Sequence, residues 1–291
     1  MWNFEIASLI KLGEIYFLIK IKLKYKVLRK VPFYFLLRWI KLFNSQVRSQ
    51  EKDHKKIPII IISFNQLYYL KQLVSFLLKS GYENIVIVDN KSTYKPLLDY
   101  FNIIEKQVTL YKLNDNYGHR VFWIRKDLFQ KYTRGYYAVT DADIVPDFKC
   151  PQDFLLHFKR ILDDNYKVNK VGFSLRIDDI PEHNQNRNRI IEWEKKFWNK
   201  KDENGNFCSD IDTTFALYRP SSFSFLKLPF FKAIRTKEPY MAVHGGWYIN
   251  TSNLTREQKH FMKTASNSSS WRISSGGDLS SSFSTNYQDP K

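Results

Sequence analysis

The strongest constraint on the fold is a regular alternation of apolar runs and helical patterns between residues 57 and 140. The apolar runs are continuous and rich in Ile and Val, as expected for strands buried on both faces, and they occupy residues 57–63, 84–90, 108–113 and 136–140. Between them, apolar residues recur at helical spacing over residues 67–78, 95–101 and 121–132. This order predicts an α/β fold with a mostly parallel sheet flanked by helices.

Polar residues follow the ends of these predicted strands. They are Ser63-Phe64-Asn65, Asp89-Asn90, the stretch 114–120 and Asp141-Ala142-Asp143. Parallel sheets bind ligands beyond the carboxyl ends of their strands, so four polar strand ends in succession predict a site at that edge. Asp141 and Asp143 offer hard oxygen ligands, which suit a divalent cation shared with phosphate oxygens.

The second half of the chain is less regular. Its patterns predict helices at 151–162 and 190–198 and strands at 170–177 and 213–218. Residues 45–56 are polar and charged, which is typical of a linker. Residues 264–291 are rich in Ser, Asn and Gly, which predicts a mobile tail.

Positive charge is concentrated at the N-terminus. Of a formal charge of +17 in 291 residues, residues 1–50 carry ten Lys and Arg against two Glu, or +8, among many apolar and aromatic residues. This composition favours a segment lying on an anionic membrane surface. Lysines interrupt its apolar runs too often for a transmembrane helix. The alternative is a helical extension packed on the catalytic domain. Nucleic-acid binding has no recognisable motif to support it.

Cysteine usage and the basic segment together give an expected location. The two cysteines, Cys150 and Cys208, form no disulfide framework and suit a reducing compartment. We therefore expect a cytoplasmic protein that is peripheral on the inner face of the cell membrane.

The order of five short motifs at predicted strand ends resembles the GT-A glycosyltransferases, and most closely the family-2-like bacterial enzymes. The motifs are Ile-Ile-Ser-Phe-Asn at 61–65, Val-Asp-Asn-Lys-Ser at 88–92, Asn-Tyr-Gly-His-Arg at 116–120, Thr-Asp-Ala-Asp at 140–143 and His-Gly-Gly-Trp-Tyr at 244–248. The resemblance covers about residues 57–248. It implies a Rossmann-like GT-A (nucleotide-diphospho-sugar transferase) domain, which we place at 57–263.

The resemblance also implies roles at the donor site. Residues 63–65, which include Ser63 and Asn65, would line the base and ribose pocket, and Asp89 would contact the nucleoside. Asn65 and Asp89 could instead cap helices or turns. The loop with Asn116, Gly118 and Arg120 would approach the diphosphate or the sugar. The metal, Mn²⁺ or Mg²⁺, would be held by Asp141, Asp143 and His244, with Asp141 also reaching the ribose.

The catalytic base is less well marked, because the family's usual Glu-Asp pair does not appear at the expected place. An inverting enzyme needs a carboxylate near the acceptor hydroxyl to take its proton. Asp212 is the favoured residue, with Asp178 or Asp179 as acceptor contacts; Glu194 and Asp210 are further candidates. Any of them could instead be a capping residue, so inversion and retention both stay open.

The expected function is therefore metal-dependent transfer of a sugar, in the hexosyltransferase class. The donor would be a nucleotide sugar, presumed UDP-linked, and the acceptor a glycan or lipid-linked glycan of surface polysaccharide synthesis. Two alternatives stay open. The first is a catalytically degenerate, membrane-bound GT-A scaffold. The second is a haloacid-dehalogenase-like phosphatase, because Asp-x-Asp-x-Val also matches the nucleophile motif of that class.

Overall fold

The computed structural model describes residues 39–40, 42–220, 230–265 and 273. The chain divides into two units, residues 1–48 and 49–291, and the second contains the sheet described below. Most of the basic segment 1–50 and of the tail 264–291 lies outside the described residues. In the part of the chain that the structure describes, no helix has the length and apolarity that crossing a membrane requires.

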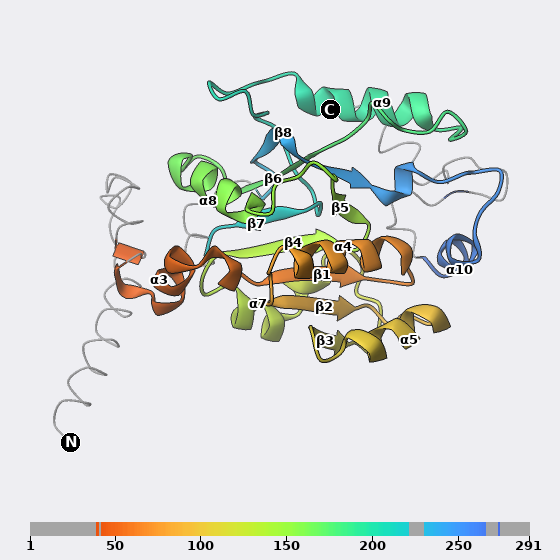
Figure 1. Cartoon of the computed structure of the whole chain (residues 1–291), viewed down its shortest axis with the longest axis horizontal. Helices are drawn as coiled ribbons and strands as arrows, with labels where there is room; N and C mark the ends of the chain where they lie inside the picture. Colours follow the sequence, from red (N-terminus) through yellow and green to blue (C-terminus); the bar gives the residue numbers. More distant parts are fainter. Residues whose placement is uncertain (1–38, 41, 221–229, 266–272, 274–291) are drawn as a thin grey trace. The chain divides into compact units, whose positions relative to one another are not determined.

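An eight-stranded sheet forms the centre of the second unit, in the order β3-β2-β1-β4-β7-β6-β8-β5. Its first half is parallel and comprises β3 (Thr109–Lys112), β2 (Ile85–Asp89), β1 (Ile59–Ser63) and β4 (Tyr137–Asp141). Figure 1 shows these strands side by side, with β1, β2 and β4 running the same way. Every residue of β1 and β2 is buried, which confirms the α/β fold expected from their continuous apolar runs.

The second half of the sheet is mixed. It contains β7 (Ala216–Tyr218), β6 (Lys170–Leu175), β8 (Ala233–His244) and β5 (Ile144–Pro146). The strand β7 is antiparallel to β4 and β6, β8 is parallel to β6, and β5 is antiparallel to β8. The chain therefore runs from β4 near the centre to β5 at the far edge, and Asp143 lies in that connection.

The unit also contains seven α-helices within its described residues. They are α4 (Tyr68–Lys79), α5 (Lys95–Ile104), α6 (Val121–Ile124), α7 (Lys126–Tyr132), α8 (Phe154–Asp164), α9 (Arg187–Lys195) and α10 (Arg256–Thr264). Among the contacts, α4 packs against β5, α6 against β1, and α8 against β6 and β7. Buried apolar residues on α4, α5 and α8 recur three and four positions apart, and they supply the helical side of the core.

Several elements differ from the sequence predictions. Residues 45–56 are not a linker but a helix, α3 (Ser45–Lys52), followed by a 3₁₀ turn at His54–Lys56. The helix predicted at 121–132 is interrupted at Arg125, whose extended backbone (ψ 91°) separates α6 from α7. The strands β5 and β8 and the helix α10 had no predicted counterpart.

Candidate functional site

The polar strand ends meet at one edge of the sheet. Registers in the parallel half pair Ser63 with Asp89 and Ile62 with Asp141, so β1, β2 and β4 end at the same level. Beyond them lies a cleft of about 1270 Å³. Residues from the ends of β1, β4 and β8, the loop at 116–119 and α10 line it.

Asp143 and His244 lie next to each other in this cleft. Asp143 Oδ2 is 3.6 Å from His244 Nδ1. The pairing of β5 with β8 causes this, because Ile144, the residue after Asp143, is in register with His244. The carbonyl of Asp143 also accepts a hydrogen bond from Gly245 N–H at 2.8 Å. Asp143 and His244, 101 positions apart in the sequence, are thus held together by backbone pairing rather than by their side chains.

The turn after His244 fixes the imidazole. Trp247 stacks on the His244 ring, with centroids 5.0 Å apart and planes 7° apart, and His244 Nδ1 accepts a hydrogen bond from Gly246 N–H at 3.1 Å. A Cβ at Gly245 would lie 2.3 Å from the ring of Tyr69, so only glycine lets α4 approach this closely. Gly245 of the motif therefore serves packing next to the site.

Asp141 lies in the same cleft, but its carboxylate contacts the segment that precedes β7. Thr213 Oγ1 donates a hydrogen bond to Asp141 Oδ2 at 2.8 Å. The pKa of Asp141 is well above its usual range, first because the carboxyl is buried and then because Asp143 is close. A cation beside two neighbouring carboxylates would relieve this repulsion.

The predicted three-residue metal group does not form in the structure. Within the described residues, no cluster of three His, Cys, Asp or Glu side chains has a metal-binding arrangement. Asp143 and His244 come together, whereas Asp141 is held by Thr213. Two protein ligands still fit Mg²⁺ or Mn²⁺ at a diphosphate, because such ions take one or two carboxylates and complete their shell with phosphate oxygens and water.

Asp89 has one carboxylate oxygen engaged and one without a partner. Its Oδ2 accepts a hydrogen bond from Ser92 N–H at 3.1 Å. Its Oδ1 is buried, with no hydrogen-bond partner in the described part of the chain, and burial raises the pKa of this carboxyl. Asp89 itself is not among the residues that line the cleft, although the next residue, Asn90, is. A buried acceptor that lacks a donor is costly, so a ligand's N–H or O–H group that reached it would stabilise it.

The loop at 116–120 is tied to the end of β2 by Asn90. The Asn90 side chain donates to the carbonyl of Gly118 at 3.0 Å and accepts from Tyr117 N–H at 3.2 Å. Asn116 and Gly118, which has a φ of +75°, line the cleft. Arg120 is exposed and is not among the lining residues; its guanidinium lies 5.9 Å from the centroid of the Phe231 ring.

Ser63 and Asn65 do not line the cleft, although Phe64 between them does. Both are fully buried. Asn65 Oδ1 accepts hydrogen bonds from the N–H groups of Thr93 and Tyr94, at 2.7 and 2.9 Å, where α5 begins. The geometry therefore favours the capping alternative for Asn65 over nucleotide contact.

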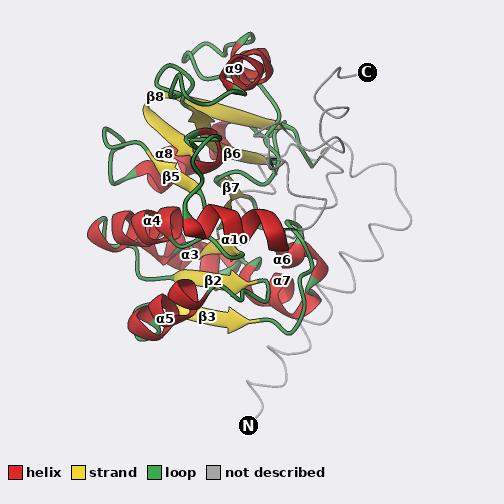
Figure 2. Cartoon of the chain, turned by 90° about the vertical axis from the view of Figure 1, so that its right-hand side faces the viewer, coloured by secondary structure: helices red, strands yellow, loops and turns green. Residues whose placement is uncertain are grey.

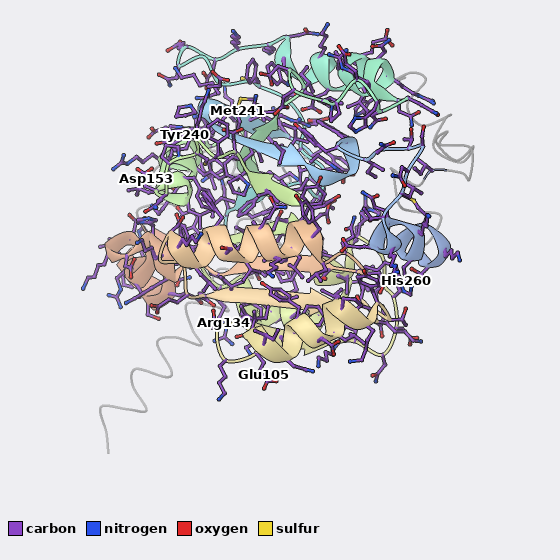
Figure 3. All side chains as sticks on the ribbon, turned by 45° about the vertical axis from the view of Figure 1, so that its right-hand side comes forward. Glu105, Arg134, Asp153, Tyr240, Met241 and His260 are labelled. Carbon is purple, nitrogen blue, oxygen red and sulfur yellow. The ribbon has the colours of Figure 1, made fainter. Side chains whose placement is uncertain are left out.

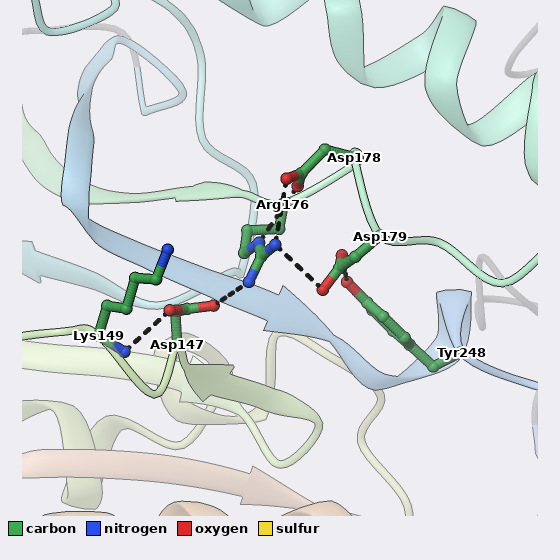
Figure 4. Close-up of polar contacts among 6 residues, drawn as sticks. All are labelled: Asp147, Lys149, Arg176, Asp178, Asp179 and Tyr248. Carbon is green, nitrogen blue, oxygen red and sulfur yellow. Dashed lines mark hydrogen bonds and ion pairs between the residues drawn. The ribbon is translucent and has the colours of Figure 1, made fainter.

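Asp178 and Asp179 surround Arg176 (Figure 4). Arg176 contacts Asp178 at 3.1 Å, Asp179 at 3.3 Å and Asp147 at 2.6 Å. The hydroxyl of Tyr248 donates to Asp179 at 2.5 Å. Neither Asp178 nor Asp179 is among the residues that line the cleft, so the predicted role as acceptor contacts gains no support from their position.

Asp212, Asp210 and Glu194 do line the cleft. Glu194 is buried and forms an ion pair with Arg235 at 2.5 Å, so its carboxylate is already engaged. The side chains of Asp210 and Asp212 are exposed to the cleft. Of the three carboxylates, the two aspartates are the ones available to an acceptor hydroxyl.

Helix α10, which has no counterpart among the sequence predictions, lines part of the cleft. Figure 2 shows α10 in front of the strand ends. Figure 3 labels His260 on this helix. Glu257 accepts the N–H of Tyr68 at 3.1 Å, Thr264 accepts from Asn65, and the Phe261 and Phe64 rings pack with centroids 6.3 Å apart. Glu257, Phe261 and Phe64 all line the cleft.

A parallel half-sheet with polar strand ends, an Asp-x-Asp connection and a nearby histidine defines a nucleotide-binding α/β domain of the GT-A type. The sequence matches the family model "Glycosyl transferase family 2" over residues 59–226. The chain therefore belongs to glycosyl transferase family 2, as its motifs implied.

Comparison with solved structures gives distant matches. One is the mannosyltransferase PcManGT from Pyrobaculum calidifontis in complex with GDP-Man and Mn²⁺, with a TM-score of 0.44 and 14% identity, covering 81% of this chain and 65% of that chain. Another is S. aureus TarS 1-349, with a TM-score of 0.43 and 10% identity, covering 74% of this chain and 68% of that chain. This chain thus spans slightly less than two thirds of the mannosyltransferase. Comparison with curated protein sequences gives no match.

Proposed function

We propose that this chain is a metal-dependent hexosyltransferase that moves a sugar from a UDP-linked donor to a hydroxyl of a glycan or lipid-linked acceptor in surface polysaccharide synthesis. The observation that carries the proposal is the placement of Asp143 and His244, 3.6 Å apart, in the cleft that Asp212 also lines. The donor and the acceptor would then bind in the same cleft.

The donor's diphosphate would lie beside Asp143 and His244. A divalent cation held there would neutralise the charge that develops on the departing nucleoside diphosphate. Asn116 and Gly118, which also line the cleft, would contact the donor, and Gly118 would let the backbone come close to it. Asp141 would orient the ribose or the cation from its position on Thr213.

The nucleoside would occupy the end of the cleft between β1, β2 and α10. Asp89 Oδ1, which lacks a partner in the described structure, would accept a hydrogen bond from the base or ribose. Phe64 and Phe261 would offer ring faces to the base. Stacking of a base on an aromatic side chain contributes about 1–3 kcal/mol.

Asp212 would act as the base for the acceptor. It would take the proton of the acceptor hydroxyl while that oxygen bonds to the anomeric carbon and the bond from this carbon to the diphosphate breaks. Its exposure to the cleft supports this role over Glu194, which is paired with Arg235.

A panel of nucleotide sugars, assayed for hydrolysis and transfer with Mn²⁺, with Mg²⁺ and with chelator, tests the proposal. We expect metal-dependent release of UDP from one or a few UDP-sugars, and loss of turnover in Asp143→Ala. Hydrolysis of phosphate monoesters without any preference for nucleotide sugars would instead favour a phosphatase, and UDP binding without turnover of any donor would favour a degenerate scaffold.

The N-terminal segment would hold the enzyme on the inner face of the cell membrane. Besides its charge of +8, its described part exposes Trp39, Leu42 and Phe43 by 57%, 56% and 65%, respectively. Such residues bury apolar surface at a bilayer interface, while each nearby Lys or Arg adds about 1 kcal/mol on anionic lipid. Deletion of residues 1–44 should abolish sedimentation with anionic vesicles, and neutral vesicles serve as the control. Unchanged sedimentation would exclude this anchoring role.

A further inference from the structure

Lys170 is a buried cation that the proposed chemistry does not use. It lies in β6, and its exposed fraction is 0%. Its ammonium donates to the carbonyl of Asp212 at 2.8 Å and to the hydroxyl of Tyr218 at 3.1 Å, and it lies 4.1 Å from the centroid of the Phe230 ring. Within the described residues no carboxylate forms an ion pair with it. Burying a lysine in this way is costly.

Lys170 supports the segment 210–213, which forms one wall of the cleft. Arg235 supports the same segment, because its Nε donates to the carbonyl of Asp210 at 2.9 Å. At the other end of the segment, Thr213 holds Asp141. Lys170 and Arg235, which lie on neighbouring strands, thus donate hydrogen bonds to the carbonyls of Asp212 and Asp210. These carbonyls flank Ile211, which is itself fully buried.

We propose that Lys170 is a positioning residue for the transfer reaction: through the carbonyl of Asp212 it sets where the Asp212 carboxylate and the Thr213 hydroxyl stand relative to Asp141. The proposal rests on the role given to Asp212 in the proposed function. A displacement of about 1 Å in such a group can cost about 100-fold in rate, so a fixed carbonyl matters more for turnover than for donor binding.

The surroundings of Lys170 make this contact sensitive to pH. Burial lowers the pKa of Lys170 to about 7, against the opposing effect of nearby Asp212 and Asp210. The charged groups facing it are those two aspartates, Arg235 and Arg120, together with the hydroxyl of Tyr218. An ammonium donates a stronger hydrogen bond than a neutral amine. The hydrogen bond from Lys170 to the carbonyl of Asp212 should therefore weaken as the pH rises above neutrality.

Lys170→Met tests the inference, with Lys159→Met as the matched control. Lys159 is also buried, but it pairs with Glu51 and Asp163 at 2.5 and 2.8 Å rather than with a carbonyl of the segment 210–213. For Lys170→Met we expect kcat to fall about 30-fold or more, while the donor KM and the Kd for UDP with Mn²⁺ stay within about 3-fold. Lys159→Met should keep the wild-type kcat even where it lowers the melting temperature.

Two further readouts separate positioning from a general effect on folding. Lys170→Gln, which keeps a donor without the charge, should recover at least about 3-fold of the rate lost in Lys170→Met. The pH profile of kcat should lose its fall above pH 7 in both variants. Wild-type kcat and an unchanged profile in Lys170→Met would overturn the inference, as would parallel loss of UDP binding and kcat.

The failure of the inference is distinct from that of the proposed function. If the wild-type protein turns over no nucleotide sugar, the proposed function fails first. If it does, the Lys170 variants decide the inference alone. Should Lys170→Met not fold, Lys170→Gln takes its place, and a wild-type kcat and pH profile in that variant count against the inference.

Discussion

Thr213 Oγ1 donates a hydrogen bond to Asp141 Oδ2 over 2.8 Å, across 72 residues of sequence. This bond joins the end of β4 to the wall of the cleft that carries Asp212. The donor side and the proposed acceptor side of the site are therefore linked by one side-chain contact as well as by the sheet.

Replacing Thr213 by Val should weaken both sides. The hydrogen bond from Thr213 lowers the pKa of Asp141, so its loss should raise that pKa further and leave a buried carboxylate oxygen unpaired. We expect a loss of about 1–3 kcal/mol in the free energy of unfolding at pH 7, measured by urea denaturation. Thr214→Val is the control, because the buried Thr214 hydroxyl has no partner in the described structure. Equal losses in the two variants would contradict the importance of the Thr213 contact.

Asp141→Asn should stabilise the metal-free protein while it impairs activity. The pKa of Asp141 is raised in the folded state, so the folded chain binds the proton more tightly than the unfolded chain. The free energy of unfolding of wild type therefore falls as the pH rises from the pKa of unfolded Asp141 through that of folded Asp141. The variant lacks this carboxyl, so its stability should not fall for this reason. We expect the free energy of unfolding of the variant to exceed that of wild type at pH 7, and this difference to disappear as the pH falls below the pKa of an unfolded Asp. A variant less stable than wild type at pH 7 in chelator would contradict this account.

Phe261→Ala tests whether α10 belongs to the nucleoside site. If a base stacks on this ring, its removal should raise the Kd for UDP, and equally for UMP, by about 10-fold. Titration calorimetry measures both, and the metal dependence of UDP binding should persist. Phe148→Ala serves as the control, because Phe148 is 82% exposed and does not line the cleft. Equal Kd values for UDP in the two variants would show that α10 does not contact the nucleotide.

Asn65→Ala separates a capping role from nucleotide contact. Because Asn65 Oδ1 accepts two N–H groups at the start of α5, we expect a loss of about 1–2 kcal/mol in the free energy of unfolding. Asn65→Asp keeps the acceptor and tolerates the φ of +50° but loses the hydrogen bond that Asn65 donates to Thr264, so it should lose less stability than Asn65→Ala. Loss of UDP affinity in Asn65→Asp with wild-type stability would instead favour nucleotide contact.

The parallel half of the fold could be predicted because its strands carry their own signal. The short, continuous runs of Ile and Val in β1 and β2 are typical of strands that are buried on both faces. In contrast, β8 contains Arg235, Lys237, Glu238 and Pro239, and neither alternation nor a continuous apolar run marks it. The helix α10 has no buried residue, so no apolar stripe indicated it.

The site could be predicted only as far as strand ends define it. Asp89, Asp141 and Asp143 follow strands that the sequence marks, and their common edge follows from parallel pairing. Which carboxylates stay available could not be predicted. The Glu194–Arg235 pair spans 41 residues, and Arg176 draws in Asp178, Asp179 and Asp147. Such pairings depend on tertiary placement, which local patterns do not contain.

We propose that Asp143 and His244 make nucleotide binding depend on a divalent cation. Titration calorimetry of UDP in Mn²⁺ and in chelator, on wild type and Asp143→Asn, tests it most directly, with the exposed Asp99→Asn as the control. The account predicts that Mn²⁺ tightens UDP binding to wild type and to Asp99→Asn by at least about 30-fold, and that Asp143→Asn loses this gain. Equal tightening by Mn²⁺ in Asp143→Asn would contradict it.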